Sequence, residues 1–307
     1  MRDPQAYDLE VPPDRAGQRI DNFLLGALRD LPRSLIYRLL RRGRIRVDGR
    51  RARPADRVSG GERITLPPLT RDDLPDREAK VPARLAERLL SAILIENEDF
   101  LVVDKPAGVA SHGGSGIRVG LIEAMRILRD EPELALAHRL DRETSGVLVL
   151  ARNRRALLAL HQALSAREVE KRYLTLLAGR LPRARLVADD PLQRVRGGRV
   201  RTADEGREAR SVFERIEVYR EATFCMVSIA TGRTHQIRAH AAALGHPVIG
   251  DARYGNFELN RDFQRRYGLN RMFLHATYLG FPWGGGSFDC SAPLPAELAG
   301  ILERMPR

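Results

Sequence analysis

The chain has 307 residues, a net charge of +12, and a composition of 43% hydrophobic and 30% charged residues. This length favours one large and one small domain, and the composition is typical of a soluble globular protein. No apolar stretch approaches the roughly 18 residues of a membrane span, and the first residues lack the apolar segment of a secretory signal. Two cysteines, Cys225 and Cys290, exclude a disulfide framework or a cysteine metal cluster. We therefore expect a cytoplasmic protein.

The positive charge is carried almost entirely by arginine. Of the 52 basic residues only three are lysine, namely Lys80, Lys105 and Lys171. A general arginine bias of the proteome would explain part of this, but residues 1–68 alone hold 15 arginines. Such an excess predicts a nucleic-acid or other polyanionic partner, contacted through the N-terminal region.

Residues 1–16 are expected to form a tail, and residues 17–68 a small α+β module. Hydrophobic spacing predicts a helix over 18–28 and a second helix that begins near Ser34. Strands are expected over 45–47 and 62–66, with a hairpin turn at Asp48-Gly49.

The second helix has one apolar face and one basic face. The basic face holds Arg33, Arg38, Arg41 and Arg42. It suits contact with an RNA backbone, although an ordinary solvated helix face would look the same.

A linker is expected over 69–90, followed by a mixed α/β domain over 91–307. Apolar runs and periodicities predict the following elements. The strands are 92–95, 100–103, 147–151, 169–177, 209–217, 222–230 and 273–281, and the helices are 117–128, 154–164 (with Asn153 as N-cap) and 295–305.

The nonapeptide HRLDRETSG at 138–146 places Asp141 between Arg139 and Arg142. Its loop runs into an apolar strand, which gives a reacting group a rigid support while substrate can still reach it. Neighbouring positive charge favours an ionised carboxylate, which suits nucleophilic attack on a polyanionic substrate. A surface turn with a local ion pair is the alternative.

Other segments are rich in groups that could surround a substrate. DKPAG at 104–108 and HGGSG at 112–116 contain glycines that let the backbone approach a phosphate or sugar, unless they are simply flexible. Tyr173 lies on an expected strand, where it would either stack on a base or join the core. TGRTHQIRAH at 231–240 is a turn that leads into a helix, followed by GHPVIGD at 245–251.

Metal and nucleotide chemistry are not expected. His235 and His240 are five residues apart, so they miss the i, i+4 face of a zinc-binding helix. The chain also lacks the glycine patterns of Walker and Rossmann sites and the signature loops of protein kinases. We therefore expect neither a metal nor a cofactor.

Taken together, these motifs resemble the RluA-type family of pseudouridine synthases, and residues 16–24, 32–47 and 61–68 resemble an S4 RNA-binding module. The resemblance implies a mixed, mainly antiparallel sheet in the catalytic domain. It makes Asp141 the catalytic aspartate and Arg238 its charge partner. Tyr173 would stack on the target uracil and assist proton transfer.

The same resemblance implies four substrate-binding residues. Arg139 would help to extrude the nucleotide, and Ile237 would pack against its base. Arg142 would contact the RNA backbone, and His112 belongs to the glycine-rich loop that follows DKPAG.

Conversion of uridine to pseudouridine breaks the N1–C1′ bond and forms a C5–C1′ bond, without gain or loss of atoms. Asp141 would either attack C1′, as in retaining glycosidases, or take the 2′ proton. The expected substrate is 23S ribosomal RNA of the large subunit, modified by a monomer with no membrane association and no obligate protein partner. Two alternatives stay open: an RluA-type synthase acting on transfer RNA, and a non-catalytic RNA-binding factor of ribosome assembly.

Overall fold

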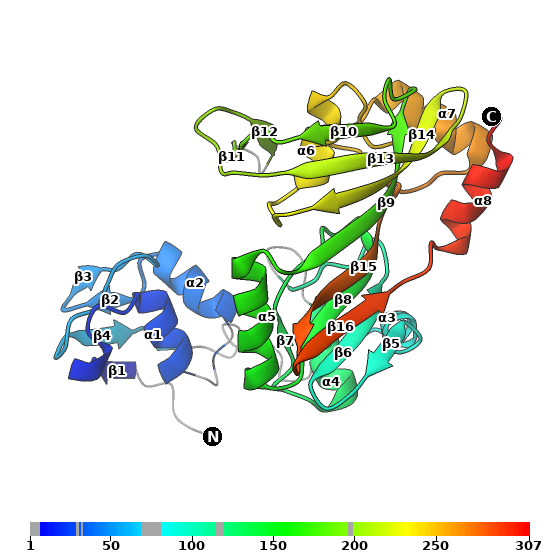
Figure 1. The fold of residues 1–307 in the computed structure, drawn as a ribbon. Coiled ribbons are helices and arrows are strands. Elements are labelled where there is room, and N and C mark those ends of the chain that lie inside the picture. Colours follow the sequence, from blue (N-terminus) through cyan, green and yellow to red (C-terminus); the bar gives the residue numbers. More distant parts are fainter. Residues whose placement is uncertain (1–6, 29–30, 32, 69–80, 114–118, 196–198) are drawn as a thin grey trace. The chain divides into compact units, whose positions relative to one another are not determined.

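The computed structural model describes residues 7–28, 31, 33–68, 81–113, 119–195 and 199–307 (Figure 1). The side chains of Arg33 and Ser34 lie outside this description, as does the start of the helix expected over 117–128. The chain divides into two compact units, Met1–Lys80 and Val81–Arg307.

The first unit packs two helices on a four-stranded antiparallel sheet. The strand order is β1-β4-β2-β3. Its elements are β1 (Tyr7–Glu10), α1 (Ile20–Ala27), α2 (Arg33–Arg41), β2 (Arg46–Val47), β3 (Arg50–Arg51) and β4 (Arg63–Leu66), with a 3-10 turn at Pro13–Arg15. Asp48 and Gly49 have positive φ angles of 44° and 76°, as the tight β2–β3 hairpin requires.

This unit begins earlier in the chain than the sequence suggested. Residues 7–10 were expected in the tail, but they form β1 and pair along the whole of β4. Leu9 packs against the core of the unit and Val11 is fully buried in it. Burial of these two side chains explains why the segment is ordered as a strand.

The second unit is built on one ten-stranded sheet with the path β10-β13-β14-β9-β15-β8-β6-β5. β16 pairs with β15, β7 pairs with β8, and all neighbours are antiparallel except β15 and β8. The strands are β5 (Ile93–Glu96), β6 (Phe100–Lys105), β7 (Ala135–Leu136), β8 (Ser145–Ala151), β9 (Glu170–Ala178), β10 (Arg185–Ala188), β13 (Ser211–Val218), β14 (Ala222–Ile229), β15 (Leu274–Trp283) and β16 (Gly286–Ser291).

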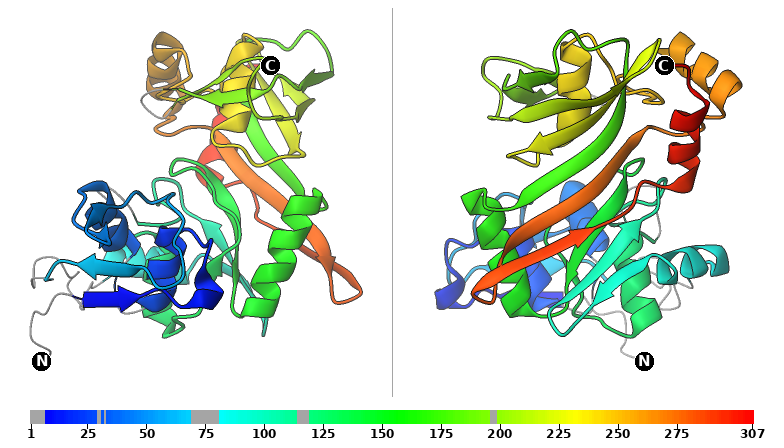
Figure 2. Two further views of the ribbon diagram at one scale, coloured as in Figure 1. Left: turned by 90° about the vertical axis from the view of Figure 1, so that its left-hand side faces the viewer. Right: turned by 45° about the vertical axis from the view of Figure 1, so that its right-hand side comes forward.

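Two long strands, β9 and β15, lie side by side through the middle of this unit (Figure 2). A small hairpin of β11 (Leu192–Arg194) and β12 (Val200–Thr202) stands apart from the large sheet. The helices are α3 (Ala83–Leu90), α4 (Leu121–Arg129), α5 (Arg154–Ala166), α6 (Gln236–Ala243), α7 (Phe257–Tyr267) and α8 (Ala296–Arg304). α5 packs on β8 and β15, and α6 packs on β12 and β13.

Central strand β8 is buried along its whole length, in agreement with its apolar sequence. At its start Gly146 has φ 114°, and an added Cβ would lie 2.1 Å from the carbonyl oxygen of Ala276 in β15. Glycine is therefore required where these two parallel strands meet.

Part of the expected linker belongs to the second unit. Residues 83–90 form α3, which packs beside α4, and Leu89 is fully buried in the same core as Met125. The amphipathic spacing of this short segment explains the difference, since its apolar side chains complete a core.

Among the described residues, no helix combines the length and apolar character that crossing a membrane would need.

Candidate active site

The loop that carries Asp141 connects β7 to β8 and is fixed at several points. The backbone N–H of Val149 donates to His138 Nε2 at 3.0 Å, so the imidazole replaces a backbone acceptor where β7 ends. Ser111 Oγ donates to the carbonyl of Leu140 at 2.9 Å. The loop therefore holds Asp141 in one place while leaving its side chain partly exposed.

A buried lysine joins this loop to the DKPAG segment. Lys105 is inaccessible to solvent, and its ammonium donates to the carbonyls of Pro106, Val109 and Arg142 at 3.1, 2.8 and 3.1 Å. Burial, together with the positive charge of Arg271, lowers the pKa of Lys105 to about 7. Lys105 therefore links the DKPAG segment to the loop that carries Asp141.

Arg238, on α6, lies between two carboxylates. Its Nη1 donates to Asp141 Oδ2 at 2.9 Å, while Nε and Nη2 donate to the two oxygens of Asp251 at 2.6 and 2.8 Å. Asp251 is fully buried. Burial alone would raise the pKa of its carboxyl, but the hydrogen bonds from Arg238 outweigh this effect and hold the pKa below its ordinary value. This bidentate pair fixes the guanidinium that meets Asp141.

The two oxygens of Asp141 are in different situations. Oδ2 accepts from Arg238 and lies 3.9 Å from His235 Nε2. In the described part of the chain, no hydrogen bond is made to Oδ1. The two carboxylate oxygens of Asp141 therefore differ in their hydrogen bonding.

Tyr254 and His235 complete this cluster. The guanidinium carbon of Arg238 lies 5.0 Å from the centre of the Tyr254 ring, a cation–π arrangement. The Tyr254 hydroxyl accepts from the N–H of Val200 at 2.7 Å and lies 2.9 Å from His235 Nδ1. β12 is thereby connected to the surroundings of Asp141.

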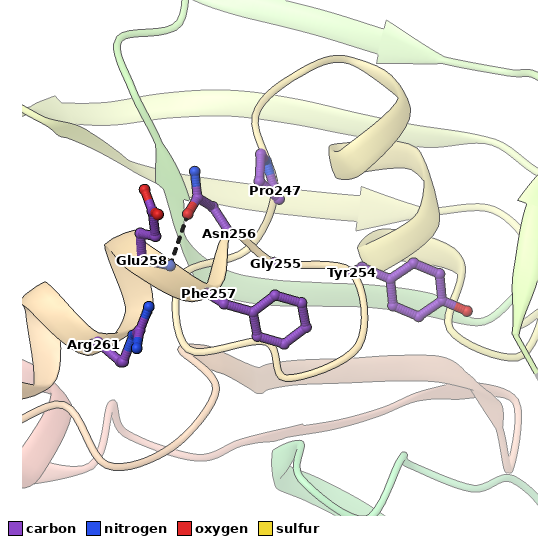
Figure 3. Close-up of a pocket in the computed structure, with 7 residues that line it drawn as sticks. All are labelled: Pro247, Tyr254, Gly255, Asn256, Phe257, Glu258 and Arg261. Atoms are coloured by element: carbon purple, nitrogen blue, oxygen red, sulfur yellow. Dashed lines mark hydrogen bonds between the residues drawn. The ribbon is translucent and has the colours of Figure 1, made fainter.

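Tyr254 also lines an open surface pocket of about 590 Å³, which Figure 3 shows at the start of α7. Phe257 on its wall is 58% exposed, and the side chain of Asn256 caps α7 by accepting from the N–H of Glu258. The remaining lining residues are Pro247, Gly255 and Arg261.

Tyr173 lies on β9 with a mostly buried ring. Burial raises the pKa of its hydroxyl above the ordinary value, and the negative charge of Asp141 adds to this shift. The phenol of Tyr173 therefore keeps its proton at neutral pH. Ile237, next to Arg238 on α6, is also buried.

The other expected site residues lie at the surface. Arg139, Arg142 and His112 are exposed, and the Arg142 guanidinium donates to the carbonyl of Gly108 at 3.0 Å. In the first unit, Arg38, Arg41 and Arg42 are exposed on or next to α2. The Arg33 side chain lies outside the described residues.

Sequence reasoning did not single out Asp251, Tyr254 or His235 as site residues. All three lie in or beside segments that were noted as rich in polar groups. They are brought to Asp141 only by the tertiary fold. Arg238, which lies next to all three, is itself 97 positions from Asp141 in the sequence. A single polar residue that follows a glycine, such as Asp251, does not by itself indicate a functional site in the sequence.

In the portion of the chain that the structure describes, no group of three or more histidine, cysteine, aspartate or glutamate side chains is arranged to hold a metal ion.

Asp141 is thus a carboxylate held by Arg238, on a loop that leads into a strand of a mainly antiparallel sheet. The RNA pseudouridylate synthase family matches residues 99–243, and the S4 domain matches residues 18–64. Ribosomal large subunit pseudouridine synthase C of Escherichia coli K12 is 39% identical over 98% of this chain and 97% of its own length. The protein of that name from Pasteurella multocida is 40% identical, over 96% and 92%.

Solved structures agree. Human RNA Pseudouridylate Synthase Domain Containing 1 is 28% identical, with a TM-score of 0.60 over 74% of this chain and 91% of its own. The human protein Domain Containing 4, 23% identical with a TM-score of 0.61 over 73% and 98%, shares the fold. The chain belongs to the RluA-type family of RNA pseudouridine synthases. The predicted resemblance, α+β fold and enzyme class are thus confirmed.

Proposed function

We propose that this enzyme converts uridines of large-subunit ribosomal RNA to pseudouridine in the cytoplasm. The relatives that match nearly its full length are named for that substrate. The S4 match and the exposed arginines of α2 support capture of an RNA backbone.

The observation that carries the proposed chemistry is the asymmetric environment of Asp141. Arg238 holds Oδ2 at 2.9 Å, and Oδ1 has no hydrogen-bond donor among the described residues. A carboxylate held by one oxygen presents the other in a defined direction. This suits a reaction at the ribose of a nucleotide that has left its stack.

The substrate-binding roles are those that the family resemblance implies. Tyr173 stacks on the extruded uracil, and Ile237 packs against its edge. Arg139, exposed on the Asp141 loop, occupies the space that the nucleotide leaves. Arg142 and His112 contact the flanking backbone.

Asp141 Oδ1 then either attacks C1′ or removes the 2′ proton, and in both routes the N1–C1′ bond breaks with its electrons moving to uracil. The uracil turns within the pocket and C5 bonds to C1′; on the first route this displaces the carboxylate of Asp141 from C1′, and on the second Asp141 returns the proton to C2′. The proton on C5 is lost and N1 gains one, so the product is an isomer of the substrate. Deuterium at C2′ distinguishes the routes, because only proton removal gives a primary isotope effect.

The test is pseudouridine mapping of total RNA from cells that lack the gene, complemented with the wild type or with Asp141→Asn. We expect specific 23S positions to lose the modification and only the wild type to restore it. Loss at transfer RNA positions instead would identify the alternative substrate. Full restoration by Asp141→Asn would contradict the catalytic assignment and favour a binding-only factor.

A further inference from the structure

We propose that His235 is a positioning residue for Asp141: its Nε2–H, together with Arg238, holds Oδ2 so that Oδ1 meets the nucleotide. The inference rests on the proposed role of Asp141 as the reacting carboxylate. It assigns a function to a side chain that the motif-based residue roles leave aside.

The tautomer of His235 follows from its partners. The Tyr254 hydroxyl oxygen already accepts the N–H of Val200 at 2.7 Å, and its single proton needs an acceptor. His235 Nδ1, 2.9 Å away, is that acceptor among the described residues. The proton of the neutral imidazole is therefore on Nε2, which faces Asp141 Oδ2 at 3.9 Å.

The opposite tautomer of His235 would satisfy fewer hydrogen-bonding groups. If the proton were on Nδ1, the Tyr254 oxygen would accept two hydrogen bonds, from Val200 and from His235. The phenol proton would then have no acceptor among the described residues. This tautomer would also turn the lone pair of Nε2 toward a carboxylate oxygen, which is repulsive. The present separation of 3.9 Å is longer than a hydrogen bond, so we expect the contact to shorten when the nucleotide enters.

The backbone of His235 is consistent with a functional constraint. The residue has φ 54° and ψ 22°, a left-handed conformation that is unfavourable for a side chain other than glycine or asparagine. It immediately precedes α6, so this conformation aims the imidazole at Asp141 from the helix that also carries Arg238. Residues kept in such conformations cluster at functional sites.

His235 is not placed to act as a general base. Its Nδ1 is occupied by the Tyr254 proton, and its Nε2 already carries a proton. Burial lowers the pKa of the imidazole, although the negative charge of Asp141 opposes that shift. A neutral imidazole that donates through Nε2 is the state that remains.

Two substitutions of His235 separate hydrogen-bond donation to Asp141 from the shape of the side chain. In His235→Gln the side-chain amide nitrogen can reach the position of Nε2, so donation to Asp141 is retained. In His235→Asn the shorter amide can reach only the position of Nδ1, next to Tyr254. The left-handed backbone favours asparagine over glutamine, so stability and activity should rank in opposite orders.

We expect His235→Asn to lower kcat by about tenfold to hundredfold, the range for loss of a hydrogen bond to a charged group. His235→Gln should stay within about threefold of the wild type, and KM should change little in either variant. Thermal unfolding serves as the control for folding. Equal activities of the two variants, or a more active His235→Asn, would overturn the proposal.

A direct measurement uses the wild-type protein. ¹⁵N chemical shifts of His235 should show a protonated Nε2 and an unprotonated Nδ1, and Tyr254→Phe should move this population toward the other tautomer. Protonated Nδ1 in the wild type would disprove the proposal whatever the activities are. Activity retained by Asp141→Asn would instead disprove the proposed function and leave the tautomer as measured.

Discussion

At the scale of single residues, one guanidinium supports two carboxylates with different surroundings. Asp141 is partly exposed and Asp251 is fully buried, yet both depend on Arg238. The buried pair with Asp251 removes the rotational freedom of Arg238 and so fixes the direction of Nη1, which donates to Asp141. Asp251 therefore acts on the geometry of Asp141 through Arg238.

Asp251→Asn should lower both stability and turnover. It leaves a buried cation with a neutral partner, and removal of one member of a buried ion pair costs about 3 kcal/mol. Urea unfolding measures the first effect and kcat the second. Asp262→Asn is the matched control, since its ion pairs with Arg265 and Arg266 lie at the surface and are worth about 1 kcal/mol or less. Equal losses in both variants would contradict a special position for Asp251.

The pairing of Asp141 with Arg238 could be predicted, and the residues around this pair could not. Asp141 stands between two arginines in a specific motif, and the family resemblance led from there to Tyr173 and Arg238. Tyr254 is defined instead by what the fold brings to it: Val200, His235 and Arg238. No spacing in the sequence encodes a contact between segments from three separate elements.

At the scale of elements, strand β8 shows how strictly the sheet is packed. It pairs with β6 along its length and meets β15 in parallel at Ser145 and Gly146. Arg271 donates to Ser145 Oγ at 2.6 Å, and that oxygen lies 2.9 Å from His275 Nδ1. This end of β8 directly follows the Asp141 loop, so its packing fixes where the loop ends.

Gly146→Ala should prevent stable folding or cost at least about 3 kcal/mol, because a Cβ there would lie 2.1 Å from backbone oxygen. Gly245→Ala is the control: its φ is also positive, at 80°, but no atom lies within 4 Å of an added Cβ. That variant should lose about 1 kcal/mol, from backbone strain alone. Denaturant unfolding of both would show whether close approach or conformation is decisive.

Elements with strong periodicity were predicted, and those defined by tertiary contacts were missed. α5 begins at its expected N-cap, where Asn153 accepts from the N–H of Ala156, and β8 matches its apolar run. α7 has a polar sequence and gains its order from the Asn256 cap and from burial of Phe263 and Tyr267. The β11–β12 hairpin has short strands whose pairing depends on packing against α6.

At the scale of the whole molecule, the chain consists of two units with separate hydrophobic cores. The core of the first unit contains no residue of the catalytic site. This separation allows RNA capture and chemistry to be tested independently.

Removal of residues 1–80 should leave the second unit folded and active on a short RNA. Affinity for long RNA should fall, and the dependence of binding on salt concentration should become weaker, because fewer phosphates are neutralised. Arg41→Ala with Arg42→Ala in the full chain should act in the same direction to a smaller extent. An unchanged salt slope in the truncated protein would contradict an RNA-binding role of the first unit.

Stability should fall as pH decreases from 6.5 toward 4. Burial lowers the pKa of His138 and of His275 from 6.5 to about 4. Between these pH values the unfolded chain binds protons at the two histidines and the folded chain does not. The contribution is full above pH 6.5 and is lost as pH falls through the folded values, by up to about 1.4 kcal/mol per pH unit for each histidine.

Urea unfolding at pH 7.5 and 4.5 measures this slope. His138→Gln keeps an acceptor for the Val149 N–H but does not titrate, so it should flatten the slope by about half. His161→Gln, at an exposed position on α5, should leave the slope unchanged. A slope unaffected by His138→Gln would show that this imidazole does not govern acid stability.

The position of β15 has a consequence for the synthesis of the protein. Asp141 precedes β8 and Tyr173 lies on β9, and in the sheet these two strands are joined only through β15, which begins at Leu274. A chain that ends before β15 contains Asp141 and Tyr173 but lacks the strand that lies between β8 and β9. We therefore expect a chain truncated before Leu274 to be inactive, although it still contains Asp141 and Tyr173.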